Sequence, residues 1–515
     1  MIQLIVNTHD YENDVRVMTQ AFYPDTKLVS HLAEFEITRD TELFSELSRL
    51  RRDGLIEDLY EVEFTVVVIV KGPKIAIRRL VPGISGEPGE ESGRLDITPV
   101  ISLCASEDMK LVRNQVKREL YALYSEATGK TLPWGTLTGI RPCKIPTKLL
   151  EEGQSDERIR EHLKEEYLAS DKKAALALEV AKVEQKLLSG IDYENGYSLY
   201  VGIPFCPTTC LYCSFTSYPI SMWKDRSDAY VDALCKELSF LSELLAGKKA
   251  ASVYIGGGTP TTLLPNQLDR LLGTIQSAFD LSELMEFTVE AGRPDSINED
   301  KLRVIKEHGI GRISINPQTM NRKTLELIGR RHSVEDVEEA FALARRLGFE
   351  DINMDLIVGL PGEGIEDVRY TLDRVKALGP DNLTVHSLAI KRAARLNTMK
   401  EQYADYRIEN TDEMIDLTGE YARNMGMVPY YLYRQKNMAG NFENVGYARP
   451  GKEGVYNVLI MEEKQSIYAA GANAQSKIVF NHGERVERIE NVKDVANYID
   501  RVDEMITRKR QFFHA

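Results

Sequence analysis

The pattern of apolar and polar residues changes near residue 190. Before that point, two apolar runs of strand length, at 61–70 and 74–80, flank the turn Gly72–Pro73 and predict a hairpin. The glycine- and glutamate-rich stretch 84–93 is predicted to be a loop. We therefore expect the start of the chain to be rich in β-structure.

Helical patterns follow this region. Apolar residues recur every three or four positions over about 107–128, and Gly129 supplies a stop signal. Charged, alanine-rich helices are predicted over about 155–188 and end at Ser189–Gly190. The first domain is thus predicted to span residues 1–190 and to have an α+β fold.

From residue 198 to about 390, short apolar runs alternate with helical segments. Repeated strand–helix units of this length predict an α/β fold with a parallel sheet and helices outside it. Six units suit a partial (βα)6 barrel of the TIM type, in which ligands collect at the carboxyl ends of the strands. The predicted strands are 198–204, 251–257, 286–291, 312–316, 352–358 and 382–389.

Two further domains follow from this pattern. The barrel is predicted to span 191–395. Residues 396–515 mix helix and strand, and we expect them to form an α+β accessory domain that caps the open side of the barrel.

Composition restricts the possible partners and compartment. The net charge of −14 argues against nucleic-acid binding, which needs a basic face. No stretch approaches the roughly 18–20 apolar residues of a membrane span, and the chain does not start like a signal peptide. Six cysteines, three of them in one loop, form no disulfide framework. We expect a cytosolic monomer that binds neither nucleic acid nor membrane.

The loop after the first predicted barrel strand carries Cys206, Cys210 and Cys213 in a C-x3-C-x2-C pattern. Three thiolates can bind three corners of an iron–sulfur cube and leave the fourth iron open. The alternative is a structural zinc site with a distant fourth ligand. Most such sites pair two C-x2-C elements, and no second pair exists here, which favours iron and sulfide.

Polar residues follow three other predicted strands. The glycines of Tyr254-Ile-Gly-Gly-Gly-Thr-Pro-Thr261 allow a ligand to approach the backbone, whose N–H and C=O groups can bind an amino group or a carboxylate. Glu290 can bond to a hydroxyl or an ammonium group, and Gln318 can both donate and accept. An ordinary turn and a solvated carboxylate are the alternatives.

Further candidates lie later in the barrel. Arg330 suits a carboxylate, although a solvated helix-end arginine is common. Asp355 stands between apolar residues and needs a partner if it is buried, while Ile357 offers an apolar face to a planar base. Lys391, Arg392 and Arg395 follow the last strand and could anchor acidic groups, or form a solvated basic turn.

These motifs together resemble a known family. The segment Tyr200-Val-Gly-Ile-Pro-Phe-Cys206-x3-Cys210-x-Tyr212-Cys213 resembles the signature of the radical S-adenosylmethionine superfamily. Gly-Gly-Gly-Thr-Pro-Thr, Val-Glu-Ala-Gly, Asn-Pro-Gln-Thr-Met-Asn and Asp-Leu-Ile-Val-Gly-Leu-Pro-Gly are similar to its oxygen-independent coproporphyrinogen III oxidase branch. Segments 133–142 and 433–447 resemble the coproporphyrinogen dehydrogenase (HemZ) subgroup.

The resemblance implies the cofactors and their contacts. Cys206, Cys210 and Cys213 would hold a 4Fe–4S cluster, whose open iron binds the amino and carboxyl groups of S-adenosylmethionine. One or two S-adenosylmethionine molecules are implied, the second near Tyr200, Ile357 and Ala389. One electron then generates a 5′-deoxyadenosyl radical. Tyr200 is implied to be catalytic as well as cofactor-binding. The other implied cofactor contacts are Tyr212, Gly257, Gly258, Thr259, Glu290, Gln318, Arg330, Asp355, Ile357 and Ala389.

The resemblance also implies an activity. In the oxidase branch two propionates of coproporphyrinogen III lose carbon dioxide and become the vinyls of protoporphyrinogen IX, with electrons from a flavodoxin- or ferredoxin-type donor. This chain departs from that branch at Phe215, where a further cysteine is usual; Ser214–Phe215 is closer to the haem chaperones. Haem binding, or radical chemistry on another tetrapyrrole, remains an alternative.

Overall fold

The computed structural model describes residues 1–24, 26–33, 40–82, 95–139, 141–391, 394–399, 403, 405–435 and 438–514. The predicted loop at 84–93 and Arg392 lie outside these ranges. The chain forms two compact units: Met1–Gly139 with Gln154–Ala175, and Ile140–Gly153 with Leu176–Ala515. Compactness does not test independent folding, so the boundaries at 190 and 395 stay predictions.

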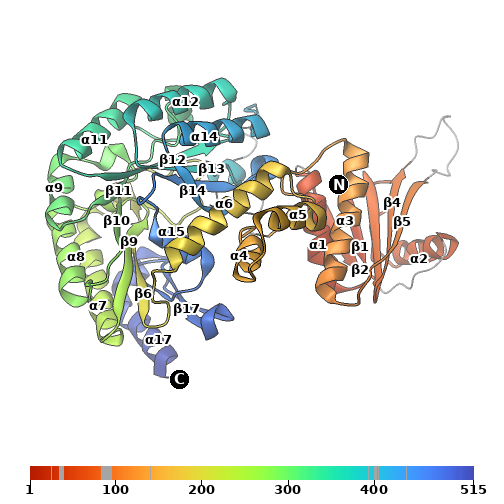
Figure 1. The fold of residues 1–515 in the computed structure, drawn as a ribbon, viewed down its shortest axis with the longest axis horizontal. Helices are drawn as coiled ribbons and strands as arrows, with labels where there is room; N and C mark the ends of the chain where they lie inside the picture. Colours follow the sequence, from red (N-terminus) through yellow and green to blue (C-terminus); the bar gives the residue numbers. More distant parts are fainter. Residues whose placement is uncertain are drawn as a thin grey trace. The chain divides into compact units, whose positions relative to one another are not determined.

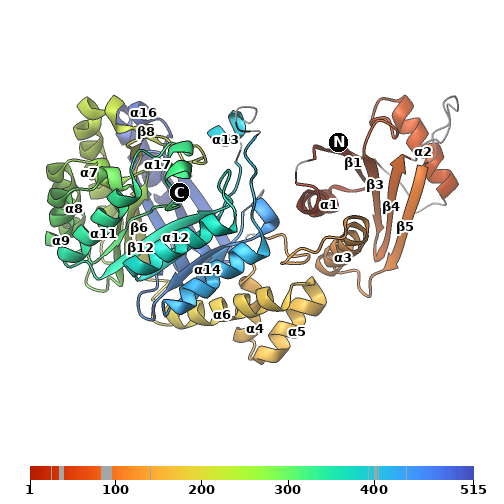
Figure 2. The same cartoon turned by 90° about the horizontal axis from the view of Figure 1, so that it is seen from above.

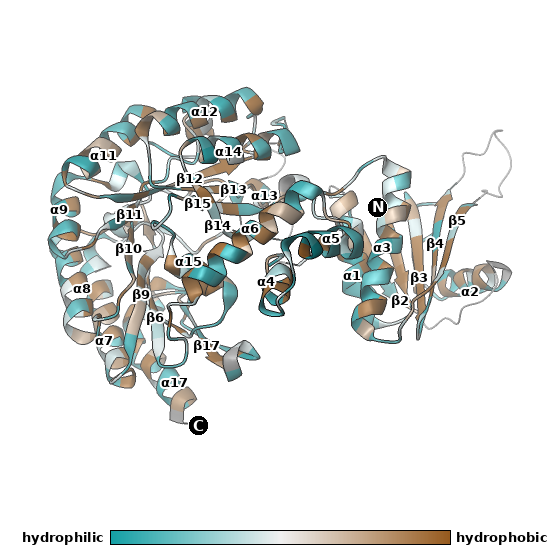
Figure 3. Cartoon of the chain, viewed as in Figure 1, coloured by the Kyte–Doolittle hydropathy of each residue, from teal (hydrophilic) through white to brown (hydrophobic). Residues whose placement is uncertain are grey.

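The first unit contains a five-stranded sheet in the order β2-β1-β3-β4-β5, in which β1 is parallel to its neighbours and β3, β4 and β5 are antiparallel. The predicted hairpin is confirmed: it consists of β3 and β4, which pair antiparallel. Both strands are mostly hydrophobic (Figure 3). The elements are β1 (Ile2–Val6), α1 (His9–Phe22), β2 (Leu28–Leu32), α2 (Asp40–Arg52), β3 (Phe64–Lys71), β4 (Lys74–Pro82), β5 (Leu95–Leu103), α3 (Met109–Thr128) and α5 (Asp156–Tyr167).

Alternation of side chains along the strands gives this sheet two apolar faces. Leu4 and Val6 pack with α1 and α3, whereas Ile5 packs with α2. The region predicted to be rich in β-structure also contains the helices α1 and α2. In α1, Val15, Met18 and Phe22 recur at helical spacing and are buried.

The second unit contains the predicted barrel, and its α/β fold is confirmed. Six parallel strands lie side by side in chain order. Helices α7, α8, α9, α11 and α12 run along the outside of this curved sheet (Figures 1 and 2). The strands are β6 (Gly196–Ile203), β9 (Lys249–Gly257), β10 (Glu286–Glu290), β11 (Arg312–Ser314), β12 (Asp351–Val358) and β13 (Asn382–Ser387). The helices are α7 (Ser227–Leu244), α8 (Pro265–Ala278), α9 (Glu299–Glu307), α10 (Arg322–Leu327), α11 (Val334–Arg346) and α12 (Ile365–Leu378).

The C-terminal residues extend the same sheet at both edges. β15 adds antiparallel to β13, and β16 adds parallel to β6, which gives eleven strands in all among the described residues. These later elements are α13 (Arg395–Thr398), α14 (Asp412–Asn424), β14 (Val428–Tyr433), β15 (Asn444–Ala448), α15 (Val455–Glu462), β16 (Ile467–Ala470), β17 (Gln475–Phe480), β18 (Arg485–Glu490), α16 (Val495–Asp500) and α17 (Val502–His514). Helices α4 (Lys144–Glu151) and α6 (Asp171–Leu188) precede the barrel.

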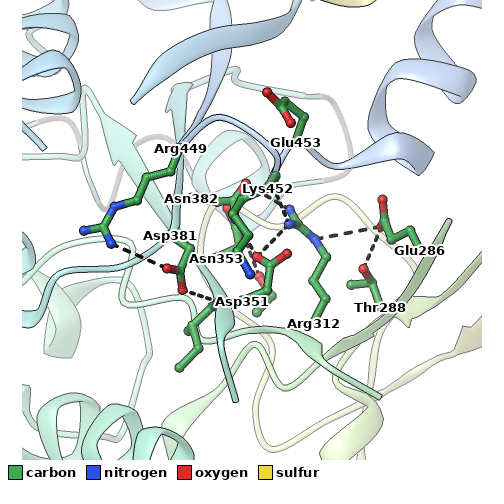
Figure 4. Close-up of polar contacts among 12 residues, drawn as sticks. Glu286, Thr288, Arg312, Asp351, Asn353, Asp381, Asn382, Arg449, Lys452 and Glu453 are labelled. Atoms are coloured by element: carbon green, nitrogen blue, oxygen red, sulfur yellow. Dashed lines mark hydrogen bonds and ion pairs between the residues drawn. The ribbon is translucent and has the colours of Figure 1, made fainter. Parts of the chain in front are cut away.

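A buried polar network lies at the amino-terminal ends of β10, β11, β12 and β13 (Figure 4). The Arg312 guanidinium donates to Asp351 at 2.8 Å and to the Lys452 carbonyl at 2.9 Å, and it lies 3.9 Å from Glu286. Burial lowers the pKa of Arg312, but the Asp351 and Glu286 carboxylates outweigh that effect and raise it. Such satisfied pairing lets charged groups occupy the interior.

None of the helices in the described part of the chain combines the length and apolar character that a membrane span requires.

Candidate active site

A cavity of about 580 Å³ lies at the carboxyl-terminal ends of the barrel strands. This is the end of a parallel sheet where ligands are expected. All of the residues predicted to hold the cluster or to contact the cofactor line it: Tyr200, Cys206, Cys210, Tyr212, Cys213, Gly257, Gly258, Thr259, Glu290, Gln318, Arg330, Asp355, Ile357 and Ala389.

The three cysteines of the loop are partly or fully buried in the wall of this cavity. Burial raises the pKa of Cys206 to about 11 and raises the pKa of Cys213 as well. Bound iron would offset this cost, because a metal ion stabilises the thiolate. In the described ranges, no three His, Cys, Asp or Glu side chains converge closely enough to hold a single metal ion. A 4Fe–4S cluster needs no such convergence, since each thiolate binds a different iron.

Backbone hydrogen bonds fix the loop between these cysteines. The Leu211 amide donates to the Ile328 carbonyl at 2.9 Å. The Leu211 carbonyl accepts from the Leu396 amide at 2.9 Å. The Thr208 hydroxyl donates to the Gly329 carbonyl at 2.9 Å. The loop is therefore held by residues that directly follow α10 and by Leu396 of α13.

The glycines at the end of β9 have a more structural role than the sequence suggested. The Gly258 and Thr259 amides donate to the Ile203 and Phe205 carbonyls, both at 2.7 Å. A Cβ at Gly258 would lie 2.6 Å from the Phe205 oxygen. These two N–H groups are thus engaged inside the protein, so the prediction that they bind a ligand does not hold for them. The Thr259 hydroxyl lies 3.5 Å from the Cys206 sulfur.

Glu290 lies at the end of β10 and accepts a hydrogen bond from the Tyr254 hydroxyl. Burial raises the pKa of Glu290 to about 7, against the lowering effects of Tyr254 and the Gly257 amide. Tyr254 stacks on Tyr456 with ring centroids 4.5 Å apart, and Tyr200 stacks beside both rings. The carboxyl group therefore sits against a stacked aromatic wall.

Gln318 and Arg330, which line the cavity, each carry an unsatisfied buried polar atom. Among the described residues, the buried Gln318 Oε1 and Arg330 Nε have no hydrogen-bond partner. Gln318 also has a φ of 68°, an uncommon conformation for a residue other than glycine. The remaining Arg330 donors bond to the Asn316 carbonyl and, at 3.2 Å, to the Tyr212 hydroxyl. Orphaned buried groups in a cavity wall fit a polar ligand.

Asp355 has the partners that its burial requires. Asn353 donates to it at 2.7 Å, and the His386 ring lies 3.8 Å away. Burial alone would raise the pKa of Asp355, but His386, Asn353 and Thr384 outweigh it and lower the pKa. Asp355 is therefore a carboxylate acceptor in this wall. Ile357 packs with Leu211 of the cysteine loop.

Lys391 and Arg395, two of the basic residues after β13, line different cavities. Lys391 lines the cavity, with its ammonium group 5.5 Å from the centre of the Phe215 ring. Arg395 instead lines a neighbouring cavity of about 680 Å³, bounded by Pro207, Thr208 and Thr209 of the cysteine loop. Arg392 lies outside the described residues, so Lys391 is the cation of this set that the structure places at the site.

Several lining residues were not predicted: Tyr254, Arg293, His386, Tyr431, Tyr433 and Tyr456. The alternation of β13 places His386 on the same face as Thr384, which was a usable signal. Tyr456 comes from α15, about 200 residues from its stacking partner, and no local pattern could reveal it.

Comparison with known proteins agrees with this site. Residues 200–375 match the family described as the Radical SAM superfamily. The oxygen-independent coproporphyrinogen-III oxidase-like protein HemZ of Bacillus subtilis (strain 168) is 41% identical, over 79% of this chain and 83% of the relative. The heme chaperone HemW of the same strain is 31% identical, over 60% of this chain and 76% of the relative.

A solved structure is also similar. It is the coproporphyrinogen III oxidase HemN of Escherichia coli, a radical SAM enzyme, at 26% identity and a TM-score of 0.49, over 62% of this chain and 73% of that one. Since 83% of the 41%-identical HemZ is matched, this chain belongs to the radical S-adenosylmethionine family of HemZ-like oxidoreductases, which use a 4Fe–4S cluster and S-adenosylmethionine.

Proposed function

We propose that this chain converts two propionates of coproporphyrinogen III to vinyl groups without oxygen, forming protoporphyrinogen IX. The observation that carries the proposal is a single cavity that gathers the three cysteines, the polar strand-end residues and Lys391. The name of the relative HemZ supports the substrate class.

Cys206, Cys210 and Cys213 would hold the cluster through their sulfurs. When bound, the cluster and S-adenosylmethionine supply a 5′-deoxyadenosyl radical that removes a hydrogen atom from the substrate. Arg330 Nε, which is buried without a partner, suits the carboxylate of the methionine part. The stacked tyrosines and Ile357 exclude water from this region, which protects reactive species.

Glu290, Gln318 and Asp355 suit the ribose. Each can accept a hydrogen bond from a hydroxyl group, and all three line the same wall. Ile357 is buried and offers an apolar surface to adenine. Tyr200 and Ala389 border the same cavity and suit S-adenosylmethionine or a second molecule of it.

Lys391 suits a propionate of the substrate. Lys391 is half-buried and lines the cavity, whereas Lys477, another lining cation, is paired with Glu463 at 3.3 Å.

Each vinyl group requires the loss of a hydrogen atom, carbon dioxide and one electron. The reaction therefore needs a one-electron acceptor as well as a flavodoxin- or ferredoxin-type donor. We further propose a cytosolic monomer.

The test is anaerobic incubation of the reconstituted protein with coproporphyrinogen III, S-adenosylmethionine, a reductant and a one-electron acceptor. We expect vinyl product together with 5′-deoxyadenosine. Cys210→Ala should lose both the cluster absorbance and deoxyadenosine formation, and full cleavage activity in this variant would contradict the ligand assignment.

A second candidate, haem binding, is favoured by one observation. Phe215 is 67% exposed at the cavity and stands where the oxidase branch has a further cysteine. Stoichiometric haem binding without turnover in the same assay would support it. A ring-opened product with haem supplied would support radical chemistry on another tetrapyrrole.

A further inference from the structure

A buried arginine that the motifs did not single out contacts the cysteine loop. Arg293 follows β10 and is 3% exposed. Its Nη1 lies 3.3 Å from the Cys210 sulfur and 3.4 Å from the Thr208 carbonyl, and its Nη2 donates to the Thr208 hydroxyl at 3.1 Å. The guanidinium thus bonds to one cysteine and to the backbone between two of them.

Asp295 holds this guanidinium in place. Arg293 Nε donates to one carboxylate oxygen at 2.9 Å, and Nη2 donates to the other at 2.7 Å. Such a two-point pair fixes direction as well as distance. The Ser296 hydroxyl donates to the Arg293 carbonyl at 2.7 Å, which fixes the backbone too. Arg293 therefore approaches Cys210 in one defined orientation.

We propose that Arg293 is a positioning residue that donates a hydrogen bond to the Cys210 thiolate and raises the reduction potential of the cluster held there. This inference rests on the proposed role of Cys210 as a cluster ligand. Hydrogen bonds to cluster sulfurs are among the protein's means of setting such potentials.

The direction of the effect follows from charge. One electron from a one-electron donor protein makes the cluster and its thiolates one unit more negative. A cationic donor stabilises the more negative state more strongly, so it favours reduction. The interaction is strong here because Arg293 is buried and little screened by water.

Other groups also act on the three sulfurs. Arg330 lies close enough to Cys210 to interact with it, and Thr259 reaches Cys206 through a neutral hydroxyl. Lys391 acts on Cys213. Arg330 and Thr259 are also expected to contact S-adenosylmethionine, so their variants would mix two effects. Asp295 opposes Arg293, because its negative charge partly cancels that of the guanidinium.

The test is a redox titration of the reconstituted cluster in the absence of substrate, monitored by electron paramagnetic resonance. Arg293→Gln should lower the midpoint potential so that the reduced-to-oxidised ratio at a fixed potential falls about tenfold, which is 59 mV for one electron. Asp295→Asn should shift the potential upward. Arg293→Lys keeps the charge and should stay closer to the unmodified protein than Arg293→Gln.

The control is Arg303→Gln, since Arg303 is exposed on α9 and pairs only with Glu299 among the contacts described. It should leave the potential unchanged. An unchanged potential in Arg293→Gln with full iron content would overturn the inference, as would equal downward shifts in Arg293→Gln and Asp295→Asn, which indicate structural damage. If Arg293→Gln loses iron, the midpoint potentials of Arg293→Lys and Asp295→Asn decide. An upward shift in Asp295→Asn supports the inference, and a downward shift overturns it.

The inference and the proposed function can fail separately. A shifted potential in a protein that forms no vinyl product would reject the function and keep the inference. Iron-free unmodified protein would overturn the ligand assignment on which the inference rests.

Discussion

Opposing effects act on the Glu290 carboxyl group. Burial raises its pKa, while the Tyr254 hydroxyl and the Gly257 amide stabilise the carboxylate and limit the rise to about 7. Glu290 is therefore protonated in much of the protein below that pH and ionised in most of it above. A carboxylate is the stronger acceptor for a ribose hydroxyl.

We expect S-adenosylmethionine affinity to increase by up to about tenfold between roughly pH 6 and pH 8, because the ionised fraction of a group with a pKa near 7 rises from about a tenth to nine tenths. Calorimetric titration of the reconstituted protein would measure it. Glu290→Gln cannot ionise and should bind with an affinity that changes much less over this range. An equally steep dependence in Glu290→Gln would assign it to another group, such as the cofactor's own amine.

Residues of the site differ in how far the sequence reveals them. Cys206, Cys210 and Cys213 stand in one loop, and Glu290 follows a strand directly, so local spacing identifies them. Arg293 also follows that strand, but an arginine beside a turn has no distinctive pattern until its buried contacts are seen. The unpartnered state of Gln318 Oε1 is likewise a property of the folded wall alone.

At the scale of elements, the end of β9 packs against the segment that carries the first cysteine. Ile203 ends β6, and its carbonyl accepts from the Gly258 amide at 2.7 Å. A Cβ at Gly258 would lie 2.8 Å from that same oxygen. The Ile203 and Phe205 oxygens that this Cβ would meet are backbone atoms and cannot rotate away. A side chain at Gly258 would therefore move the end of β9 relative to the end of β6.

Gly258→Ala should therefore disturb the cysteine loop more than the barrel. We expect a stability loss of about 1–3 kcal/mol from overpacking and less than about half the iron content of the unmodified protein. Iron analysis and urea unfolding would measure the two effects. Gly273→Ala is a matched control on α8, where an added Cβ meets only the His308 ring at 3.9 Å. Full iron in Gly258→Ala would show that this close approach is not required.

Elements were predicted unevenly for physical reasons. The six barrel strands are short apolar runs bounded by turns, and all were found within a few residues of their ends. α1 carried a helical pattern, with Thr8 accepting from the Asp10 amide as a cap, that was outweighed by nearby strand signals. The pairing of β15 with β13 and of β16 with β6 joins distant segments, which periodicity alone does not specify.

At the scale of the molecule, the C-terminal residues complete the barrel sheet beside the cysteine strand. β16 covers the edge of β6, which leads into the loop with Cys206. Lys509 of α17 is 1% exposed, and its ammonium group lies 2.5 Å from the Glu237 carboxylate on α7. Glu237 also accepts from the Tyr498 hydroxyl at 2.6 Å and from the Gly471 amide at 2.9 Å. The last helix is thus tied to the turn that follows β16.

Lys509→Met should test this tie, because it leaves the Glu237 carboxylate buried without its cation. Removing one partner of a buried pair costs about 3–5 kcal/mol, so the free energy of unfolding in urea should fall by that amount. The double variant Lys509→Met, Glu237→Gln should recover most of the loss, since an amide oxygen can still accept from Tyr498 and Gly471 without carrying charge.

If β16 supports the cysteine strand, iron content should fall in Lys509→Met and recover in the double variant, in parallel with stability. A loss of stability in Lys509→Met with full iron retention would instead separate the C-terminal elements from the site. Failure of the double variant to recover would place the cost in the other contacts of Lys509, which are the packing of its stem and its hydrogen bond to the Asn491 Oδ1 at 2.7 Å, rather than in the unpaired Glu237 charge.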